Sequence, residues 1–271
     1  MRYAICNELF GAMDFAASCG MIAAAGFTGI EIAPFTLGPD PSALGPDRVS
    51  ALRRTILDSG LSFAGMHWLL AAPPGLHLAS AEAATRRRTV DFLKAMCDLA
   101  GGLGGGMLVL GSPRQRGAQH VPASEALAFL REALAECGPH AAACGSKILL
   151  EALSSAQTEV VNLMSEAEAM VRGIGGPGLG CMLDFHNCVD EVEGFDALVD
   201  RHHALIRHVH LNDPDGGHPR AGDLSYLPAF RRLVAHGYEG WVSLEIFGVP
   251  EDPGLVLSET MDYLRGIEAE L

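Results

Sequence analysis

The sequence predicts a single α/β domain over residues 1–271, folded as a (β/α)8 TIM barrel, on three observations. Short apolar runs typical of strands alternate with longer segments that carry apolar residues at helical spacing. Eight such β-then-α units follow one another along the chain. The length of 271 residues also suits eight units, because a barrel of this kind usually needs about 250 residues.

Eight short apolar runs are the expected strands. Their expected bounds, in chain order, are Arg2–Cys6, Gly29–Ala33, Ser62–His67, Met107–Gly111, Lys147–Leu153, Gly178–Asp184, Ile206–Leu211 and Trp241–Ile246. Runs of this length that are apolar almost throughout are typical of parallel strands buried on both faces.

The segments between these runs are the expected helices, with capping residues at their starts and glycines at several of their ends. Asp14 is expected to cap the first helix, which ends at Gly26, and Ser165 the fifth, which ends at Gly173. The other expected helices are Ser50–Leu57, Ser80–Gly101, Ser124–Cys144, Phe195–Leu205, Leu227–His236 and Leu255–Leu271.

A doubly wound parallel sheet is the alternative fold. It would normally place a glycine-rich phosphate-binding turn after the first strand, and Asn7–Gly11 is not such a turn. The glycine-rich stretch Gly101–Gly106 precedes a strand and opens no helix, so we expect it to be a helix-to-strand turn. The barrel is therefore favoured.

The composition disfavours two classes of partner. The net charge of −14 argues against a nucleic-acid surface, which needs clustered lysine and arginine. No apolar run approaches the roughly 20 residues of a membrane span, and Met1–Cys6 is too short for a signal segment. We expect a cytoplasmic protein with a small-molecule substrate and neither nucleic-acid nor membrane partners. A homo-oligomer stays possible.

The seven cysteines show no C-x-x-C spacing, and several lie in apolar strand or helix patterns. We therefore expect reduced, buried thiols and no thiolate zinc site.

Four polar residues stand at the ends of the last four expected strands: Glu151, Asp184, His210 and Glu245. In a barrel the carboxyl ends of all strands lie at one face, so these side chains should converge. Three carboxylates and one imidazole predict a site for one divalent cation. Mn²⁺ is favoured, and Mg²⁺, Co²⁺ or Zn²⁺ are possible.

The order of these residues resembles the xylose isomerase-like barrel superfamily, which includes sugar 3-epimerases, hydroxypyruvate isomerase and endonuclease IV. The segments that carry the resemblance are Leu150-Glu151, Leu183-Asp184-Phe185-His186, His208-Val209-His210-Leu211-Asn212-Asp213 and Ser243-Leu244-Glu245. The resemblance spans essentially the whole chain, and the spacing of the four residues is similar to that in ketose 3-epimerases.

The resemblance implies roles for these residues. Glu151 and Glu245 would each ligate the metal and form the acid/base pair, whereas Asp184 and His210 would be ligands only. His186 and Arg220 would hold substrate oxygens.

The implied reaction is isomerisation or epimerisation of a sugar or sugar acid, by proton transfer through a metal-bound enediolate. Such a reaction needs a base on one face of the carbon and a proton donor nearby. The cation would stabilise the negative charge of the enediolate.

The chain also departs from the epimerase pattern. The epimerases show Asp-x-x-His, whereas only Phe185 separates Asp184 from His186 here. A second glutamate that they carry after the first is replaced by Gln157. A supporting carboxylate hydrogen bond is therefore expected to be absent or replaced.

Further candidates lie at the ends of the earlier strands. His67 closes the third strand and is expected to contact substrate, or else to be a hydrogen-bonded histidine at the barrel mouth, and Trp68 after it could form an apolar wall. Arg114 and Arg116 follow the fourth strand and could bind a phosphate or carboxylate through forked donors, unless they lie on a solvated loop. Glu31, inside the second strand, is a weaker candidate for the barrel mouth.

Three other functions remain as alternatives. The same metal site could serve a lyase, a dehydratase or decarboxylase of a keto-sugar acid, which the two arginines would suit. A non-catalytic sugar-binding barrel is disfavoured, because binding alone needs no acid/base pair. A nuclease is disfavoured by the acidic charge and because no histidine occurs in Leu110-Gly111-Ser112 after the fourth strand.

Overall fold

Eight parallel strands form a closed barrel in the described part of the chain, paired in sequence order from β1 to β8. The computed structural model describes residues 1–119, 121–220, 222 and 225–271. The strands are β1 Arg2–Cys6, β2 Gly29–Ile32, β3 Ser62–Met66, β4 Met107–Leu110, β5 Lys147–Leu150, β6 Leu179–Asp184, β7 Ile206–Leu211 and β8 Trp241–Leu244. The predicted TIM barrel is thus confirmed.

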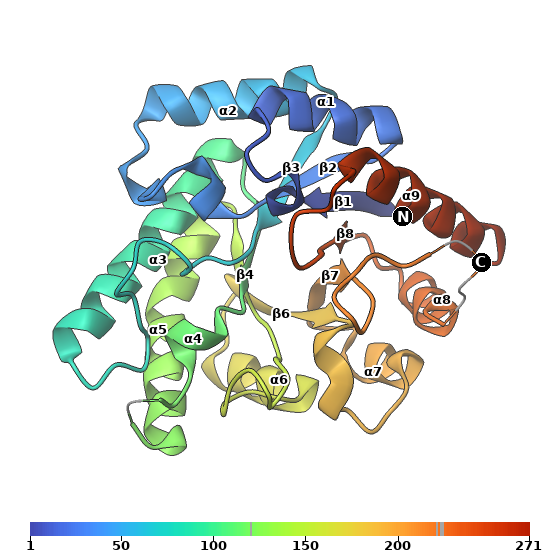
Figure 1. Cartoon of the computed structure of the whole chain (residues 1–271). Helices are drawn as coiled ribbons and strands as arrows, with labels where there is room; N and C mark the ends of the chain where they lie inside the picture. Colours follow the sequence, from blue (N-terminus) through green and yellow to red (C-terminus); the bar gives the residue numbers. More distant parts are fainter. Residues whose placement is uncertain (120, 221, 223–224) are drawn as a thin grey trace.

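The helices surround the strands as an outer ring (Figure 1). They are α1 Phe15–Ala25, α2 Pro46–Asp58, α3 Ala83–Leu103, α4 Pro113–Arg116, α5 Ala123–Ala143, α6 Met164–Ile174, α7 Phe195–His202, α8 Leu227–Ala235 and α9 Pro253–Ala269. Short 3-10 turns lie at Asn7–Phe10, Pro34–Leu37, Pro41–Ala43 and Asn187–Asp190. Among the helices so described, none has the length and hydrophobicity needed to cross a membrane.

Pairing between β1 and β8 closes the barrel, with Ala4 opposite Ser243 and Ile5 opposite Leu244. Glycine is required where the indole ring of Trp241 packs against β2. A Cβ atom added to Gly29 would lie 2.7 Å from that ring. The sequence thus places its smallest residue where a side chain of β8 reaches across β1 to the backbone of β2.

The capping residues of the first helix act as expected. Asp14 Oδ1 accepts hydrogen bonds from the backbone N–H groups of Ala16 and Ala17. Gly26 ends the helix in the left-handed conformation, with φ of 103°. Both ends of α1 are therefore set by the local sequence.

Three of the predicted helix starts are wrong. Ser50 lies inside α2, which begins at Pro46. Ser165 lies inside α6, where the Glu166 side chain accepts from the N–H groups of Asn162 and Leu163 instead. Ser80 precedes α3, which begins at Ala83, and its hydroxyl accepts from the N–H of Glu82. Ser80 precedes the actual N-cap residue by two positions and Ser165 follows it by two, and a serine near a helix start has the same sequence signature as a cap.

The glycine-rich stretch is a helix-to-strand turn, as predicted. Helix α3 ends at Leu103, and β4 begins at Met107. Gly104 and Gly105 join them with φ values of 124° and 81°, a region that favours glycine.

Several strands end earlier than the sequence predicts. Strand β5 ends at Leu150, β3 at Met66 and β8 at Leu244. Glu151, His67 and Glu245 therefore begin the loops at the carboxyl face of the barrel, which is where active sites of this fold lie.

Candidate functional site

The four predicted ligands converge at the carboxyl ends of β5 to β8. Glu151 follows β5, Asp184 ends β6, His210 lies near the end of β7, and Glu245 follows β8. All four are buried, with exposed fractions between 1% and 5%. Ionisable groups this deeply buried need a partner of opposite charge.

His210 lies at the centre of this group. Its Nδ1 atom is 3.0 Å from Glu245 Oε2 and 3.6 Å from Asp184 Oδ2. Ligand atoms of Glu151, Asp184 and His210 all lie within 4.8 Å of one another. Donor atoms at this spacing can share one cation after small side-chain rotations, because each bond to such an ion is about 2 Å long.

The donor set fits a divalent cation. His210 Nδ1 is buried and makes no well-aligned hydrogen bond with the described residues, although it faces two carboxylates. A buried nitrogen left without a hydrogen bond is costly, and a cation between it and the carboxylates would remove that cost. Oxygen-rich ligation with one imidazole suits Mn²⁺ and related ions.

The electrostatics of the group point the same way. Burial, together with the charges of Asp184 and Glu245, raises the pKa of Glu151 well above its usual range. Burial also raises the pKa of Glu245, in part against the effect of His210. Burial acts to raise the pKa of Asp184 as well, but His210 lowers it overall. Several carboxylates in one buried space thus favour additional positive charge.

A second set of contacts lies beside His210, around Glu31 of β2. Glu31 is completely buried and accepts hydrogen bonds from His208 Nε2 at 2.7 Å and His210 Nε2 at 3.1 Å. His67 Nδ1 lies 3.6 Å from Glu31 Oε1. His67 Nε2 is 3.8 Å from Glu245 Oε1. These five residues form one buried His/Glu cluster, a candidate metal site.

Sequence reasoning did not find the pairing of Glu31 with His208. Glu31 was expected at the barrel mouth, whereas its carboxylate is held within the barrel by two histidines of β7. A signal was present, since His208 and His210 are two residues apart and side chains two apart in a strand share a face. Nothing in the sequence indicates that His208 and His210 contact a residue of β2.

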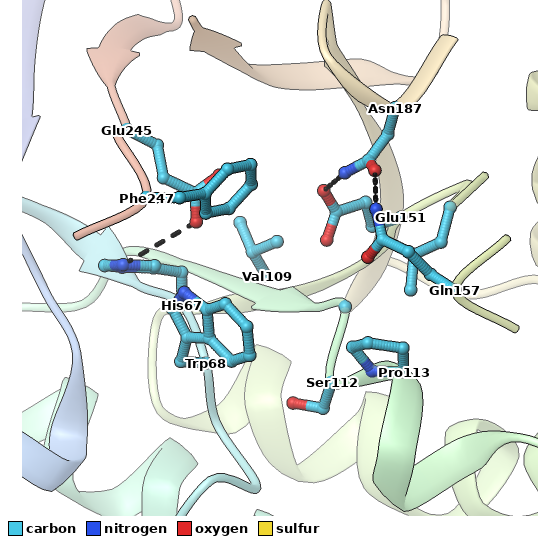
Figure 2. A pocket seen from close by; sticks show the side chains of 12 residues that line it. His67, Trp68, Val109, Ser112, Pro113, Glu151, Gln157, Asn187, Glu245 and Phe247 are labelled. Carbon is cyan, nitrogen blue, oxygen red and sulfur yellow. Dashed lines mark hydrogen bonds and ion pairs between the residues drawn. The ribbon is translucent and has the colours of Figure 1, made fainter. Parts of the chain in front are cut away.

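Two side-chain amides flank Glu151, as Figure 2 shows. Asn187 Nδ2 donates to Glu151 Oε1 at 3.0 Å, and Gln157 Nε2 donates to Asn187 Oδ1 at 2.7 Å. Asn187 was missed from the sequence. The sequence does carry a signal for Asn187, because this residue lies three positions after Asp184, where the epimerase pattern has histidine.

A pocket opens above these groups (Figure 2). The residues that line it are His67, Trp68, Val109, Gly111, Ser112, Pro113, Glu151, Leu153, Gln157, Asn187, Glu245 and Phe247. His67 and Trp68 thus lie at the pocket, where the sequence predicts substrate contacts. The lining combines two carboxylates with aromatic walls, a composition typical of small-molecule sites.

His186 does not line this pocket as described. It is half-buried and packs edge-on against Phe247, with ring centroids 4.8 Å apart. The contact of His186 with substrate therefore stays a prediction.

The predicted pair of arginines does not form a fork facing the pocket. Arg116 is completely buried, and its Nη2 donates to the backbone oxygen of Glu151 at 2.8 Å. Arg114 is exposed. The physical reason is the short helix α4, which directs Arg116 inward and Arg114 outward. This helix was not predicted from the sequence.

Arg220 is exposed in the segment after β7, next to residues outside the described part. Its contact with substrate therefore stays a prediction.

The seven cysteines are free, as expected, and five of them are buried. Cys144 lies near Asp98 and His140 on the outer helices. Because Asp98 there is exposed and already pairs with His140 at 2.8 Å, an ordinary surface ion pair accounts for this group.

The family model for the xylose isomerase-like TIM barrel matches residues 19–267. The chain belongs to the xylose isomerase-like TIM barrel family. The resemblance inferred from the strand-end motifs is thereby confirmed.

Similar proteins within this family are sugar isomerases and epimerases at low identity. One, from Streptomyces coelicolor, carries a name that proposes a hydroxypyruvate isomerase; it is 28% identical over 236 residues, 82% of each chain. An L-ribulose 3-epimerase of Mesorhizobium japonicum is 28% identical over 205 residues, covering 73% of this chain and 66% of the relative.

The fold is close to that of a D-psicose 3-epimerase from Clostridium cellulolyticum, solved with D-tagatose. The TM-score is 0.86 at 16% identity, with 99% of each chain covered. At this identity the likeness supports the barrel fold alone.

Proposed function

We propose that the protein is a divalent-cation-dependent isomerase or epimerase, which moves a proton at a carbon next to the carbonyl group of a sugar. One observation carries the proposal. Glu151 and Glu245, from two different strands, face one pocket and share a buried ligand set with Asp184 and His210 (Figure 2). Binding without catalysis would need no such pair of carboxylates.

Glu151, Asp184, His210 and Glu245 would hold the cation. When bound, the ion would supply positive charge that stabilises negative charge developing on the substrate oxygens. Mn²⁺ is the favoured ion, and Mg²⁺, Co²⁺ or Zn²⁺ would also suit this donor set.

Glu151 and Glu245 would act as base and acid, exchanging roles with the direction of reaction. Burial raises the pKa of both carboxyl groups in the metal-free protein, and a bound cation would offset this rise and keep them ionised, as a base must be. Asn187 holds Glu151 Oε1 in one orientation, and Gln157 holds Asn187. Such pre-orientation lowers the barrier, because the base need not reorganise.

The pocket favours an uncharged sugar over a sugar phosphate or sugar acid. Its described lining includes no lysine or arginine, and Arg116 is buried outside this lining, where its Nη2 atom donates to the backbone oxygen of Glu151. Trp68 and Phe247 offer apolar faces, on which the C–H faces of a sugar can pack. The lyase alternative would use the same metal site, and the arginines that would suit its acidic substrate do not line this pocket as described.

Proton NMR in D₂O tests this proposal. Protein loaded with Mn²⁺ is incubated with ketoses, sugar phosphates and keto-sugar acids, and a Glu151→Gln variant is the control; each sample is stripped of metal before spectra are recorded. We expect wild-type protein alone to incorporate deuterium next to a carbonyl of a free ketose, with a new stereoisomer or aldose. Loss of hydroxyl or CO₂ would replace this function with the lyase. Equal exchange by Glu151→Gln would contradict the assigned base.

A further inference from the structure

We infer that Glu31 is a positioning residue, which holds His210 with its Nδ1 atom directed at the cation. Glu31 comes from β2, on a different strand from the four ligands. It lines no part of the pocket as described, so it would act through His210 and not on the substrate. This inference rests on the cation site proposed above.

The two ring nitrogens of His210 face different groups. Nε2 lies 3.1 Å from Glu31 Oε1 in a well-aligned hydrogen bond, whereas Nδ1 lies 3.0 Å from Glu245 Oε2. An ionised carboxylate only accepts hydrogen bonds, so Nε2 must carry the proton. A neutral ring with its proton on Nε2 presents the Nδ1 lone pair, which is the form that binds a cation.

Glu31 is itself held in place. Its second oxygen, Oε2, accepts from His208 Nε2 at 2.7 Å, so each carboxylate oxygen has a histidine partner. His208 and His210 lie on the same face of β7, since side chains two residues apart in a strand point the same way. The carboxylate can therefore not rotate without breaking one of two buried hydrogen bonds, and it fixes the plane of the His210 ring.

Glu31, His208 and His210 could also be taken for a cation site, because their ligand atoms lie within 4.8 Å of one another. The hydrogen bonds argue otherwise. Both Glu31 oxygens already accept N–H groups, and a cation here would have to displace both protons. His210 Nδ1, on the other side of its ring, makes no well-aligned hydrogen bond with the described residues and faces the carboxylates of Glu245 and Asp184. The Nε2 atoms of His208 and His210 that face Glu31 thus carry protons. The cation is therefore expected at His210 Nδ1.

Titration of metal-free protein with Mn²⁺, followed by the EPR signal of the free ion, tests the inference. We expect one ion per wild-type chain, and Glu31→Gln should bind it about 10 to 100 times more weakly, as is typical when the partner of a ligating histidine is lost. Glu168→Gln is the matched control, because the Glu168 carboxylate also pairs with a buried histidine, His202, between α6 and α7 and makes no described contact with His210. Its affinity should stay within about threefold of wild type.

Two variants keep the inference open to refutation if Glu31→Gln does not fold. Glu31→Asp retains the charge but is too short to reach both histidines, so it should bind Mn²⁺ several times more weakly than wild type and more tightly than any folded Gln variant. His208→Gln removes the hydrogen bond from His208 Nε2 to Glu31 Oε2 and should also weaken the binding of Mn²⁺. Wild-type affinity in Glu31→Gln, or in Glu31→Asp and His208→Gln together, would overturn the role of Glu31.

The absorption spectrum of the Co²⁺-loaded protein separates positioning from ligation. Its intensity depends on the number and geometry of the ligands. We expect Glu31→Gln, saturated with Co²⁺, to keep the wild-type coordination number. A lost ligand would show that Glu31 binds the ion directly and would overturn the inference while leaving the proposed function intact. No Mn²⁺ bound by wild-type protein would overturn both.

Discussion

Gly111 leaves the space that the Glu151 carboxylate occupies. A Cβ atom at this position would lie 2.1 Å from Glu151 Oε2, far inside van der Waals contact. The backbone of Gly111 is not in the left-handed region, so alanine is excluded by crowding and not by conformation. A single methyl group should therefore move one residue that is both a proposed base and a proposed ligand.

Gly111→Ala should fold and lose at least about tenfold in kcat, because a misplaced base and ligand loses orientation for catalysis. Steady-state kinetics and circular dichroism measure both effects. Gly20→Ala is the control, since nothing lies within 4 Å of a Cβ there in helix α1; it should keep full activity. Wild-type kcat in Gly111→Ala would contradict the position of Glu151.

Asn187→Ala removes the amide that donates to Glu151 Oε1. A hydrogen bond to a charged group contributes about 1.5–3 kcal/mol, which corresponds to about 10- to 100-fold in rate. We expect kcat to fall by this amount, with a smaller change in KM. A change confined to KM would mean that Asn187 binds substrate but does not orient Glu151.

At the scale of elements, the short helix α4 follows β4 and contacts the residue after β5 through one side chain. Arg116 of α4 is completely buried and bonds the backbone oxygen of Glu151. Burial lowers the pKa of Arg116 to about 10, so the side chain stays charged at neutral pH. The helix thus places one fixed positive charge beneath a cluster of carboxylates.

Arg116→Met should lower the free energy of unfolding by about 1–3 kcal/mol, because the Glu151 oxygen would lose its donor. Urea denaturation of the metal-free protein measures this change. Arg114→Met, two residues away but exposed, should change stability by less than about 0.5 kcal/mol. Equal effects of the two substitutions would contradict the special role of Arg116.

The strands were more predictable than the helix ends or α4. β1 and β7 have the predicted bounds, because buried parallel strands read as short apolar runs with sharp polar ends. Those same polar ends identified the four ligands. α4 has only four residues, too few for a helical pattern, so the direction of Arg116 could not be predicted. Asn187 and the contact of Glu31 with His208 depend on which loops and strands meet in space.

At the scale of the whole molecule, the acidic charge of −14 and the buried carboxylates favour cation binding over binding of anions. Protons compete with the cation in the metal-free protein. Burial and neighbouring carboxylates raise the pKa of Glu151. Burial acts to lower the pKa of His210, but Glu245 and Glu31 raise it overall. Both groups therefore keep protons at pH values where solvated groups would have lost them.

The affinity for Mn²⁺ should therefore weaken as pH falls from about 8 to about 6, by up to about tenfold per pH unit for each proton displaced. The sign follows because a raised pKa means that the metal-free form binds more protons, which the cation must release. Calorimetry in two buffers of different ionisation enthalpy measures that release. Affinity that is constant over this range, without proton release, would contradict the assignment of these ligands.

We propose above all that a divalent cation binds among Glu151, Asp184, His210 and Glu245. Anomalous diffraction at the manganese edge, from crystals grown with Mn²⁺, tests it most directly. The structure predicts one strong peak on the Nδ1 side of His210, within about 2.4 Å of a ligand atom from each of the four residues. A peak between Glu31 and His208, or no peak at the barrel end, would contradict the claim.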